Sequence, residues 1–190
     1  MSTNKLKICL VGDSAAGKTA LLEFFLFGRD HKVLSEQSTT GVDMFEFTYK
    51  KDGVDWLIEF WDAAGQDDYD PYHPSFFFCS DCCIFCFDSV RRITYKNLKQ
   101  WYRDMISIAT TGSIPCFVFC NKVDLNPDAT KRTYKFATER NFPLFFTSAA
   151  DGTNVVQGFT TAIDEAIRMR AEREAGNVDD LVRDVMDVLE

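Results

Sequence analysis

Several features that would place a chain in a membrane or on nucleic acid are missing from these 190 residues. No apolar run approaches the roughly 18 residues that a membrane-spanning helix needs. Residues 1–5 lead directly into a predicted strand, so we expect no signal peptide. Basic residues number 21 against 29 acidic ones, and the formal net charge of −8 argues against a nucleic-acid or anionic-membrane surface. Because internal repeats and low-complexity segments are also missing, the length favours one domain, with or without a tail.

Cysteine is the only residue type whose spacing suggests a metal knuckle, since residues 79–86 contain the pattern C-x-x-C-C-x-x-C. Such knuckles normally carry turn residues between their ligands, whereas residues 82–87 form an unbroken apolar stretch. In a strand Cys82 and Cys86 face one way and Cys83 the other, so the four thiols cannot converge on one ion. We interpret the cysteines as small buried hydrophobic residues in a reducing cytosol, and expect a cytoplasmic protein.

Residues 12–19, G-D-S-A-A-G-K-T, fit the phosphate-loop pattern G-x-x-x-x-G-K-[ST]. A predicted buried strand at 6–11 precedes this loop and a predicted helix at 20–27 follows it. Glycines let the backbone wrap around an anion, and the helix dipole directs its positive end to the same place. Lys18 would neutralise the outer phosphates, and the Thr19 hydroxyl would bind Mg²⁺. The nucleotide contacts expected from this loop are Ser14, Ala15, Ala16, Gly17, Lys18 and Thr19.

Apolar strands and helices alternate along the rest of the chain, which predicts an α/β fold with a largely parallel sheet covered on both faces. The segment K-D-G at 51–53 predicts a hairpin turn. The other predicted strands are 44–49, 56–61, a cysteine-rich strand ending at residue 88, 114–120 and 143–146. The other predicted helices are 95–108, 133–138 and 153–174, the last of which ends at Gly176 as a C-cap.

Two further motifs follow predicted strands, where parallel sheets bind their ligands. The first, D-A-A-G at residues 62–65, would supply the Asp62 carboxylate near Mg²⁺ and the Gly65 N–H for a γ-phosphate. The second, N-K-V-D at residues 121–124, would read guanine, because the Asp124 carboxylate can accept hydrogen bonds from N1–H and from the 2-amino group. Adenine offers neither donor there, and a buried acceptor left unpaired discriminates by on the order of 10⁴.

The remaining residues of the second motif have expected roles as well. The stem of Lys122 would lie against the purine ring, and Asn121 would tie this loop back to the phosphate loop. N-K-x-D alone is a common polar turn. Together with the phosphate loop and D-x-x-G, it predicts a guanine-nucleotide site.

These motifs resemble those of the Ras-type small GTPases over about residues 6–173. F-W-D-A-A-G-Q at 60–66 is similar to the Rab branch, and I-T-Y-K-N-L at 93–98 and S-A-A-D-G-T-N-V-V at 148–156 resemble the Rab-like 2 subfamily. The resemblance implies a P-loop NTPase domain at 5–175, with a Ras-type six-stranded, mostly parallel sheet flanked by helices on both faces. It also implies a GTP/GDP switch that works with the intraflagellar transport B complex or a basal-body protein at the base of the cilium.

By the same resemblance, residues 30–40 and 65–78 are the two switch segments. Thr39, which is the threonine of the Rab pattern T-x-G-V-D at residues 39–43, would join Thr19 and Asp62 at Mg²⁺. The expected catalytic residues are Gln66, which would orient the attacking water, Lys18 and Gly65. Without an arginine finger such enzymes turn over at only ~10⁻⁴ to 10⁻³ s⁻¹. Because residues 30–40 contain no arginine, we expect slow intrinsic hydrolysis and a GTPase-activating partner.

Two departures from the family pattern concern the nucleotide. Ser148, Ala149 and Ala150 are expected nucleotide contacts, but relatives carry S-A-K there, so a side chain over the base is missing. Lys32 stands where an aromatic residue usually walls the nucleotide. We therefore expect looser binding and faster exchange than in an ordinary Rab protein. A GDP half-life of hours in Mg²⁺ would contradict this.

Rab proteins usually recognise effectors through an exposed aromatic cluster beside the switches, whose counterparts here are Met44, Trp61 and Phe76. Ordinary core packing of these residues is the alternative, and the sequence leaves both open.

The C-terminal residues 177–190 predict an amphipathic helix with an acidic face. Such a helix suits a protein groove or packing on its own domain, because membrane-surface helices are basic. Membrane-anchored Rab proteins end in prenylated cysteines, whereas the last cysteine here is Cys120. We therefore expect no direct lipid anchor and a monomer when the protein is free.

Three other functions stay open at this point. One is a GTP-binding scaffold with negligible hydrolysis, which Asp67 and Asp68 would favour by repelling phosphates. Another is a conventional vesicle-trafficking Rab protein. The third, a phosphate-loop nucleoside kinase, would leave N-K-x-D unexplained and would need an acceptor-binding lid that nothing in the sequence resembles.

Overall fold

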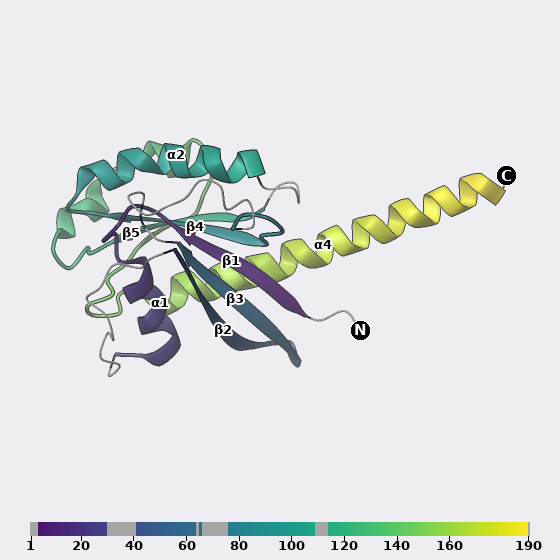
Figure 1. The fold of residues 1–190 in the computed structure, drawn as a ribbon, viewed down its shortest axis with the longest axis horizontal. Coiled ribbons are helices and arrows are strands. Elements are labelled where there is room, and N and C mark those ends of the chain that lie inside the picture. Colours follow the sequence, from purple (N-terminus) through teal and green to yellow (C-terminus); the bar gives the residue numbers. More distant parts are fainter. Residues whose placement is uncertain (1–3, 30–40, 64, 66–75, 109–113, 190) are drawn as a thin grey trace.

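The computed structural model describes residues 4–29, 41–63, 65, 76–108 and 114–189, and of 177–189 only the helical backbone. Within these ranges six strands form one sheet, and helices cover both of its faces (Figure 1). The strands are β1 (Lys5–Val11), β2 (Val42–Lys51), β3 (Val54–Ala63), β4 (Cys82–Asp88), β5 (Cys116–Asn121) and β6 (Leu144–Phe146). The helices are α1 (Lys18–Phe27), α2 (Arg92–Ile108), the 3-10 helix η1 (Pro127–Lys131), α3 (Lys135–Thr138) and α4 (Val155–Leu189).

The sheet has the strand order β2-β3-β1-β4-β5-β6, and all of its neighbouring pairs are parallel except β2 and β3. That antiparallel pair is the predicted hairpin, whose turn residues Asp52 and Gly53 have φ angles of 51° and 80°. Left-handed backbone at both positions is what a two-residue type I′ turn requires. The predicted α/β fold, with a six-stranded and mostly parallel sheet, is confirmed.

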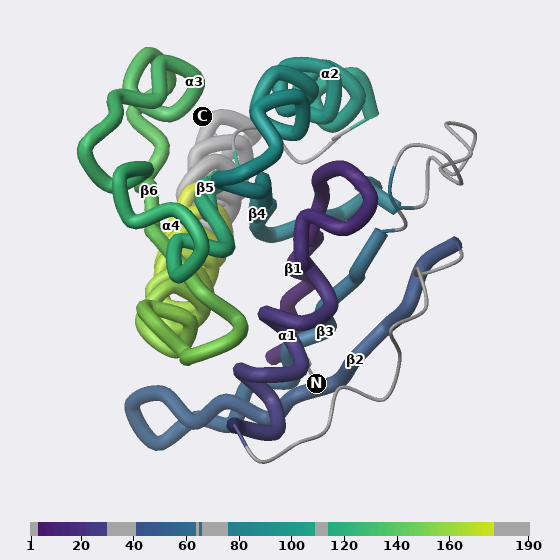
Figure 2. Tube along the Cα trace, turned by 90° about the vertical axis from the view of Figure 1, so that its left-hand side faces the viewer, coloured from purple at the N-terminus to yellow at the C-terminus, as the bar shows by residue number. Residues whose placement is uncertain are grey.

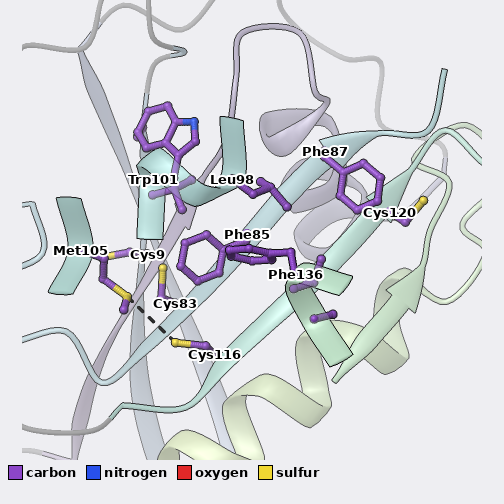
Figure 3. Close-up of a cluster of buried hydrophobic side chains, with 14 of the residues drawn as sticks. Cys9, Cys83, Phe85, Phe87, Leu98, Trp101, Met105, Cys116, Cys120 and Phe136 are labelled. Atoms are coloured by element: carbon purple, nitrogen blue, oxygen red, sulfur yellow. Dashed lines mark hydrogen bonds between the residues drawn. The ribbon is translucent and has the colours of Figure 1, made fainter. Parts of the chain in front are cut away.

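The core lies in two layers, one on each face of the sheet. Helices α2 and α3 pack on one face, and α1 and α4 pack on the other (Figure 2). The central strands β1 and β4 are buried on both faces over residues 8–11 and 82–87, which is why these stretches are continuously apolar. Figure 3 shows the layer under α2, where the Cys116 thiol lies 4.0 Å from the Met105 sulfur.

The cysteines of β4 alternate between these layers as predicted. Cys83 belongs to the α2 layer, and Cys82 and Cys86 to the α1–α4 layer. Burial raises the pKa of Cys86 to about 12, so this thiol stays neutral. Cys79 departs from the prediction that the cysteines are buried, because it precedes the strand and is exposed.

Helix α4 also differs from the prediction, since it runs unbroken through Gly176, where the sequence predicts a helix end. A glycine C-cap needs left-handed backbone, and Gly176 does not have a positive φ angle. Glycine inside a helix costs only about 1 kcal/mol relative to alanine, and no proline follows to stop the helix. The structure thus places no break between 5–175 and 177–190, and the side chains of the predicted acidic amphipathic helix lie outside the described residues.

Ion pairs join α4 to the residue that precedes β4. Arg170 and Arg173 donate to one oxygen of the buried Asp81, which precedes β4, over 3.2 and 2.9 Å. Past this point the helix extends away from the body of the protein (Figure 1). Of the helices in the described ranges, none combines the length and the apolar character needed to cross a membrane.

Candidate functional site

The candidate site lies at the edge of the sheet where the parallel strands end, as in other open α/β sheets. The phosphate loop joins β1 to α1, and Asp62 stands at the end of β3. The strand register places Asp62 beside Leu10, and Asp88 beside Asn121. The structure therefore brings together three motifs that are separated by 40 residues or more in the chain.

The phosphate loop depends on its two glycines because other groups lie very close to them. A Cβ atom on Gly12 would stand 2.0 Å from the carbonyl oxygen of Cys86, and one on Gly17 would stand 2.3 Å from Nδ2 of Asn121. Both glycines also have positive φ angles, 144° and 91°. A side chain at either position would therefore displace β4 or the N-K-V-D loop from the phosphate loop.

Lys18 is buried with its ammonium group against the loop itself. Nζ donates to the carbonyl oxygens of Gly12 and Asp13 over 2.8 and 3.3 Å. Burial lowers the pKa of Lys18, and the nearby Asp62 opposes that shift. The loop thus presents a buried cation whose partners within the described residues include neutral carbonyl groups, which suits an anionic ligand.

Asp62 is fully buried, and its two oxygens differ. The Thr19 hydroxyl donates to Oδ2, whereas Oδ1 has no hydrogen-bond partner among the described residues. Burial raises the pKa of Asp62 to about 6, against the opposing effects of Lys18 and Thr19. A buried carboxylate oxygen without a partner, next to a hydroxyl group, fits a hard cation that prefers oxygen ligands, such as Mg²⁺.

Gly65, the glycine of D-x-x-G, lies against the phosphate loop. A Cβ atom built on it would be 2.0 Å from the backbone nitrogen of Ser14. Only a residue without a side chain allows this approach of the two backbones, so the structure brings the second motif into contact with the first.

The N-K-V-D loop is hydrogen-bonded to the phosphate loop through two side chains. Nδ2 of Asn121 donates to the carbonyl oxygen of Ala16 over 2.9 Å, and Nζ of Lys122 donates to that of Ala15 over 2.8 Å. The tie predicted for Asn121 is therefore present. Asp124 is exposed, so the expectation of a buried acceptor at this position is wrong for the protein without a ligand. No hydrogen bond to its carboxylate occurs within the part of the chain that the structure describes. Its two oxygens can accept hydrogen bonds from a ligand.

Asp88 supports this loop from the end of β4, a role that the sequence analysis missed. Its Oδ2 lies 2.8 Å from Nζ of Lys122, and its Oδ1 accepts the backbone N–H of Val90 over 2.7 Å. Burial raises the pKa of Asp88, but the hydrogen bonds from Lys122 and Val90 outweigh it, so the pKa lies below its ordinary value. The only signal in the sequence was an acidic residue ending an apolar strand.

The loop that follows β6 is closed on itself and lies beside the N-K-V-D loop. Oγ of the buried Ser148 accepts the backbone N–H groups of Ala150 and Asp151 over 3.2 and 3.3 Å. Backbone hydrogen bonds join Thr147 to β5 and to Val123. Ala149 is half-buried and Ala150 is exposed. The loop therefore presents methyl groups and backbone at the base-reading end.

Several predicted residues are not placed. Thr39 and Gln66, with Lys32 and the acidic pair at 67–68, lie outside the described residues.

The three effector candidates do not share one environment. Met44 is 52% exposed, Trp61 is half-buried, and Phe76 is fully buried. The rings of Trp61 and Phe76 pack edge to face, with centroids 6.3 Å apart. Of the two alternatives left open by the sequence, core packing holds for Phe76, because its ring fills the core beside β3. Of the three, Met44 is the side chain that offers a large exposed surface.

Comparisons with known proteins agree with this geometry. The model of the Ras family matches residues 7–168. Rab-like protein 2A of Pongo abelii is 37% identical over 187 residues, which cover 98% of this chain and 78% of the relative. Rab-like protein 2A of Mus musculus is 40% identical over 85% of this chain and 71% of its own length. For Rab-like protein 2B of Homo sapiens the identity is 39%, over 86% of this chain and 70% of the relative.

The chain therefore belongs to the Ras family, a class of GTP-binding switches. Its relatives place it among the Rab-like GTPases. Members of the family bind GTP and GDP, typically with Mg²⁺. The buried Lys18 fits the phosphates of such a nucleotide, and the oxygens of Asp62 and Thr19 fit Mg²⁺.

Proposed function

We propose that this protein is a GTP/GDP-binding switch with slow intrinsic hydrolysis, which recruits an effector complex in its GTP state. One observation carries the proposal most directly. The base-reading motif is hydrogen-bonded to the phosphate loop through Asn121 and Lys122. A single nucleotide can therefore contact both motifs, with phosphates at residues 14–19 and a purine near Asp124.

Each functional side chain has a proposed role. Lys18 neutralises charge on the β- and γ-phosphates, and Gly65 donates its N–H to the γ-phosphate. Mg²⁺, held by Thr19, Asp62 and Thr39, would stabilise charge on the phosphate oxygens when bound. Gln66 orients the attacking water. Asn121, Lys122 and Asp124 bind the base together with Ser148, Ala149 and Ala150.

Single-turnover hydrolysis of GTP tests the enzymatic part of this proposal. Wild-type protein should hydrolyse GTP at ~10⁻⁴ to 10⁻³ s⁻¹, and Gln66→Leu should slow the reaction about tenfold or more. Gln100→Leu, on the exposed side of α2, is the matched control and should keep the wild-type rate. Equal rates for wild type and Gln66→Leu would contradict a catalytic Gln66 and would favour a GTP-binding scaffold.

The cellular role follows only from the likeness of residues 93–98 and 148–156 to the Rab-like 2 subfamily. On that basis the proposed effector is the intraflagellar transport B complex or a basal-body protein, with the protein in the cytoplasm and at the base of the cilium. A GTPase-activating partner and an acidic helix at 177–190 that docks in a protein groove complete this proposal. A conventional vesicle-trafficking Rab protein is the alternative.

Pull-down from ciliated cells with protein loaded with GDP or with a non-hydrolysable GTP analogue separates these alternatives. Intraflagellar transport or basal-body proteins should be captured only in the GTP state, and Met44→Ala should weaken the capture. Met169→Ala, on α4, is the control. Capture that does not depend on the nucleotide would contradict the switch, and capture of vesicle-tethering proteins would favour the conventional Rab role.

A further inference from the structure

The second residue of the phosphate loop, Asp13, has its carboxylate bound to α2. The side chain is 8% exposed. Its Oδ1 accepts the indole Nε1–H of Trp101 over 3.1 Å, and its Oδ2 accepts Nδ2–H of Asn97 over 2.7 Å. Asn97 and Trp101 are four residues apart on α2, so both donors lie on one face of the helix. The two oxygens of one carboxylate are thus each held by a neutral donor.

The backbone of the same residue takes part in the loop. Its carbonyl oxygen accepts hydrogen bonds from Lys18 over 3.3 Å and from the backbone N–H of Ala16 over 3.2 Å. Just before α2, the guanidinium group of Arg91 donates to the carbonyl oxygen of Ser14, the next loop residue. Residues 91–101 therefore form hydrogen bonds with two successive residues of the phosphate loop, Asp13 and Ser14.

Helix α2, which carries Asn97 and Trp101, is held in place by its packing on the sheet. Trp101 is 1% exposed and belongs to the buried layer between α2 and the sheet, together with Leu98 and Met105 (Figure 3). The position of the Asp13 backbone therefore follows from the packing of α2, and the packing is set by residues more than 80 positions away in the chain.

A buried carboxylate needs hydrogen-bond donors. Lys18 could supply them, but its positive charge would then be shared with Asp13 instead of being available to the phosphates. The amide of Asn97 and the indole of Trp101 satisfy the carboxylate without using a cation. Hydrogen bonds to an ionised group are also the stronger kind.

We propose that Asn97 and Trp101 are positioning residues for nucleotide retention, which hold the phosphate loop in its binding shape through the Asp13 carboxylate. This inference rests on the proposed function, since the ligand retained is a guanosine diphosphate. Without the two donors, the buried carboxylate lacks hydrogen bonds and the loop backbone shifts with it. The nucleotide then leaves faster.

The test is the rate of release of fluorescent GDP in Mg²⁺ from full-length protein. Trp101→Phe keeps an aromatic ring but removes the donor, and Asn97→Leu keeps the size of the side chain without its amide. Each change should speed release about tenfold, the effect expected for the loss of a hydrogen bond to a charged group. Gln100→Ala, on the same helix, is the control, because Gln100 bonds only to Asp104 and Arg103 among the described residues.

A double-mutant cycle with Asp13→Ala separates positioning from general loss of stability. If the donors act through Asp13, release from Asp13→Ala/Trp101→Phe should be no faster than from Asp13→Ala alone. If the role of Trp101 is merely structural, the effects of Asp13→Ala and Trp101→Phe on the release rate should multiply in the double variant. That result would overturn the inference. Should Trp101→Phe fail to fold, the cycle with Asn97→Leu makes the same distinction.

The outcomes also separate this inference from the proposed function. Wild-type protein that retains GDP, with release from both variants within about twofold of wild type, overturns the positioning role alone. Wild-type protein that binds no guanine nucleotide overturns the proposed function and this inference with it.

Discussion

Two buried aspartates at the edge of the sheet differ in what surrounds them. Asp88, at the end of β4, has Lys122 at 2.8 Å, and its pKa lies below the ordinary value. Asp62, at the end of β3, has a hydroxyl group on one oxygen and no hydrogen-bond partner on the other, and burial raises its pKa to about 6. The charge of Asp88 is compensated by the protein itself. We infer that the charge of Asp62 is compensated fully when a cation binds.

This difference separates the candidate site into two parts. The base-reading part, around Asp88, Asn121 and Lys122, is assembled by contacts within the protein. The proposed metal part, around Asp62 and Thr19, leaves one carboxylate oxygen without a partner among the described residues. We infer that the metal part responds most to the presence of Mg²⁺ and the outer phosphates, and that the base-reading part keeps its structure throughout.

The largest effect is expected for Lys18, the buried cation of the phosphate loop. Lys18→Met keeps the aliphatic stem and removes a buried positive charge. Affinity for GDP should fall about 10²- to 10³-fold, as for other charge pairs truncated on one side in a buried site. Fluorescence titration measures the dissociation constant, and Lys99→Met, at an exposed position of α2, is the control. An affinity within threefold of wild type would exclude the proposed role of Lys18.

The Asp62→Asn change should reveal the uncompensated charge. In EDTA at pH 7 we expect the free energy of unfolding to rise by roughly 1–3 kcal/mol, because an isosteric neutral group replaces a buried carboxylate. A raised pKa destabilises the fold above about pH 6, so this advantage should shrink as the pH falls from about 6 towards 4. Mg²⁺ should stabilise the wild-type protein in complex with GDP, but not the variant. Urea unfolding checks all three effects, and a destabilised variant in EDTA would refute the comparison.

The Asn121→Ala change should weaken GDP binding through the base-reading part, whether or not Mg²⁺ is present. It removes the hydrogen bond to Ala16 that joins the two loops. GDP affinity should fall about tenfold, the effect of one lost buried hydrogen bond, and by the same factor with Mg²⁺ and with EDTA. An effect seen only in Mg²⁺ would mean that the two parts are not separable.

The smallest effect is expected for Asp88→Asn. The pKa of Asp88 lies below its ordinary value of 3.8, so its carboxylate stabilises the fold above that pH. The variant should lose about 1 kcal/mol at pH 7, and the loss should vanish as the pH falls below about 4. Unfolding measured across this range tests the sign, which is opposite to that for Asp62. A loss that is constant with pH would show that Lys122 does not compensate the charge.

Short contiguous motifs account for most of what the sequence could predict. Residues 12–19 and 121–124 each bring their chemistry within one loop, and the tie from Asn121 follows from the two motifs together. The contacts of Asp13 with Asn97 and Trp101 span 84 and 88 positions, so only the packing of α2 reveals them. The same holds for Asp88, whose partner becomes evident from the register of β4 and β5.

Two other features, the continuous helix through Gly176 and the burial of Phe76, could not be predicted from short stretches of sequence. Gly176 matched a helix end by residue type, but a single glycine is a weak stop among good helix formers. Phe76 packs against Trp61 and is buried, which its position inside a predicted switch segment could not show.

The most direct test of the central claim is the base preference of wild-type protein and of Asp124→Asn. Xanthine carries a carbonyl group where guanine carries its 2-amino group, so an asparagine amide can donate where the carboxylate accepts. In competition with labelled GDP, wild-type protein should prefer GTP over XTP and ATP by about 10²-fold or more, the effect of two hydrogen bonds to a charged group, and the variant should prefer XTP over GTP. Equal binding of ATP and GTP by wild-type protein, or an unchanged preference in the variant, would contradict a guanine-reading Asp124.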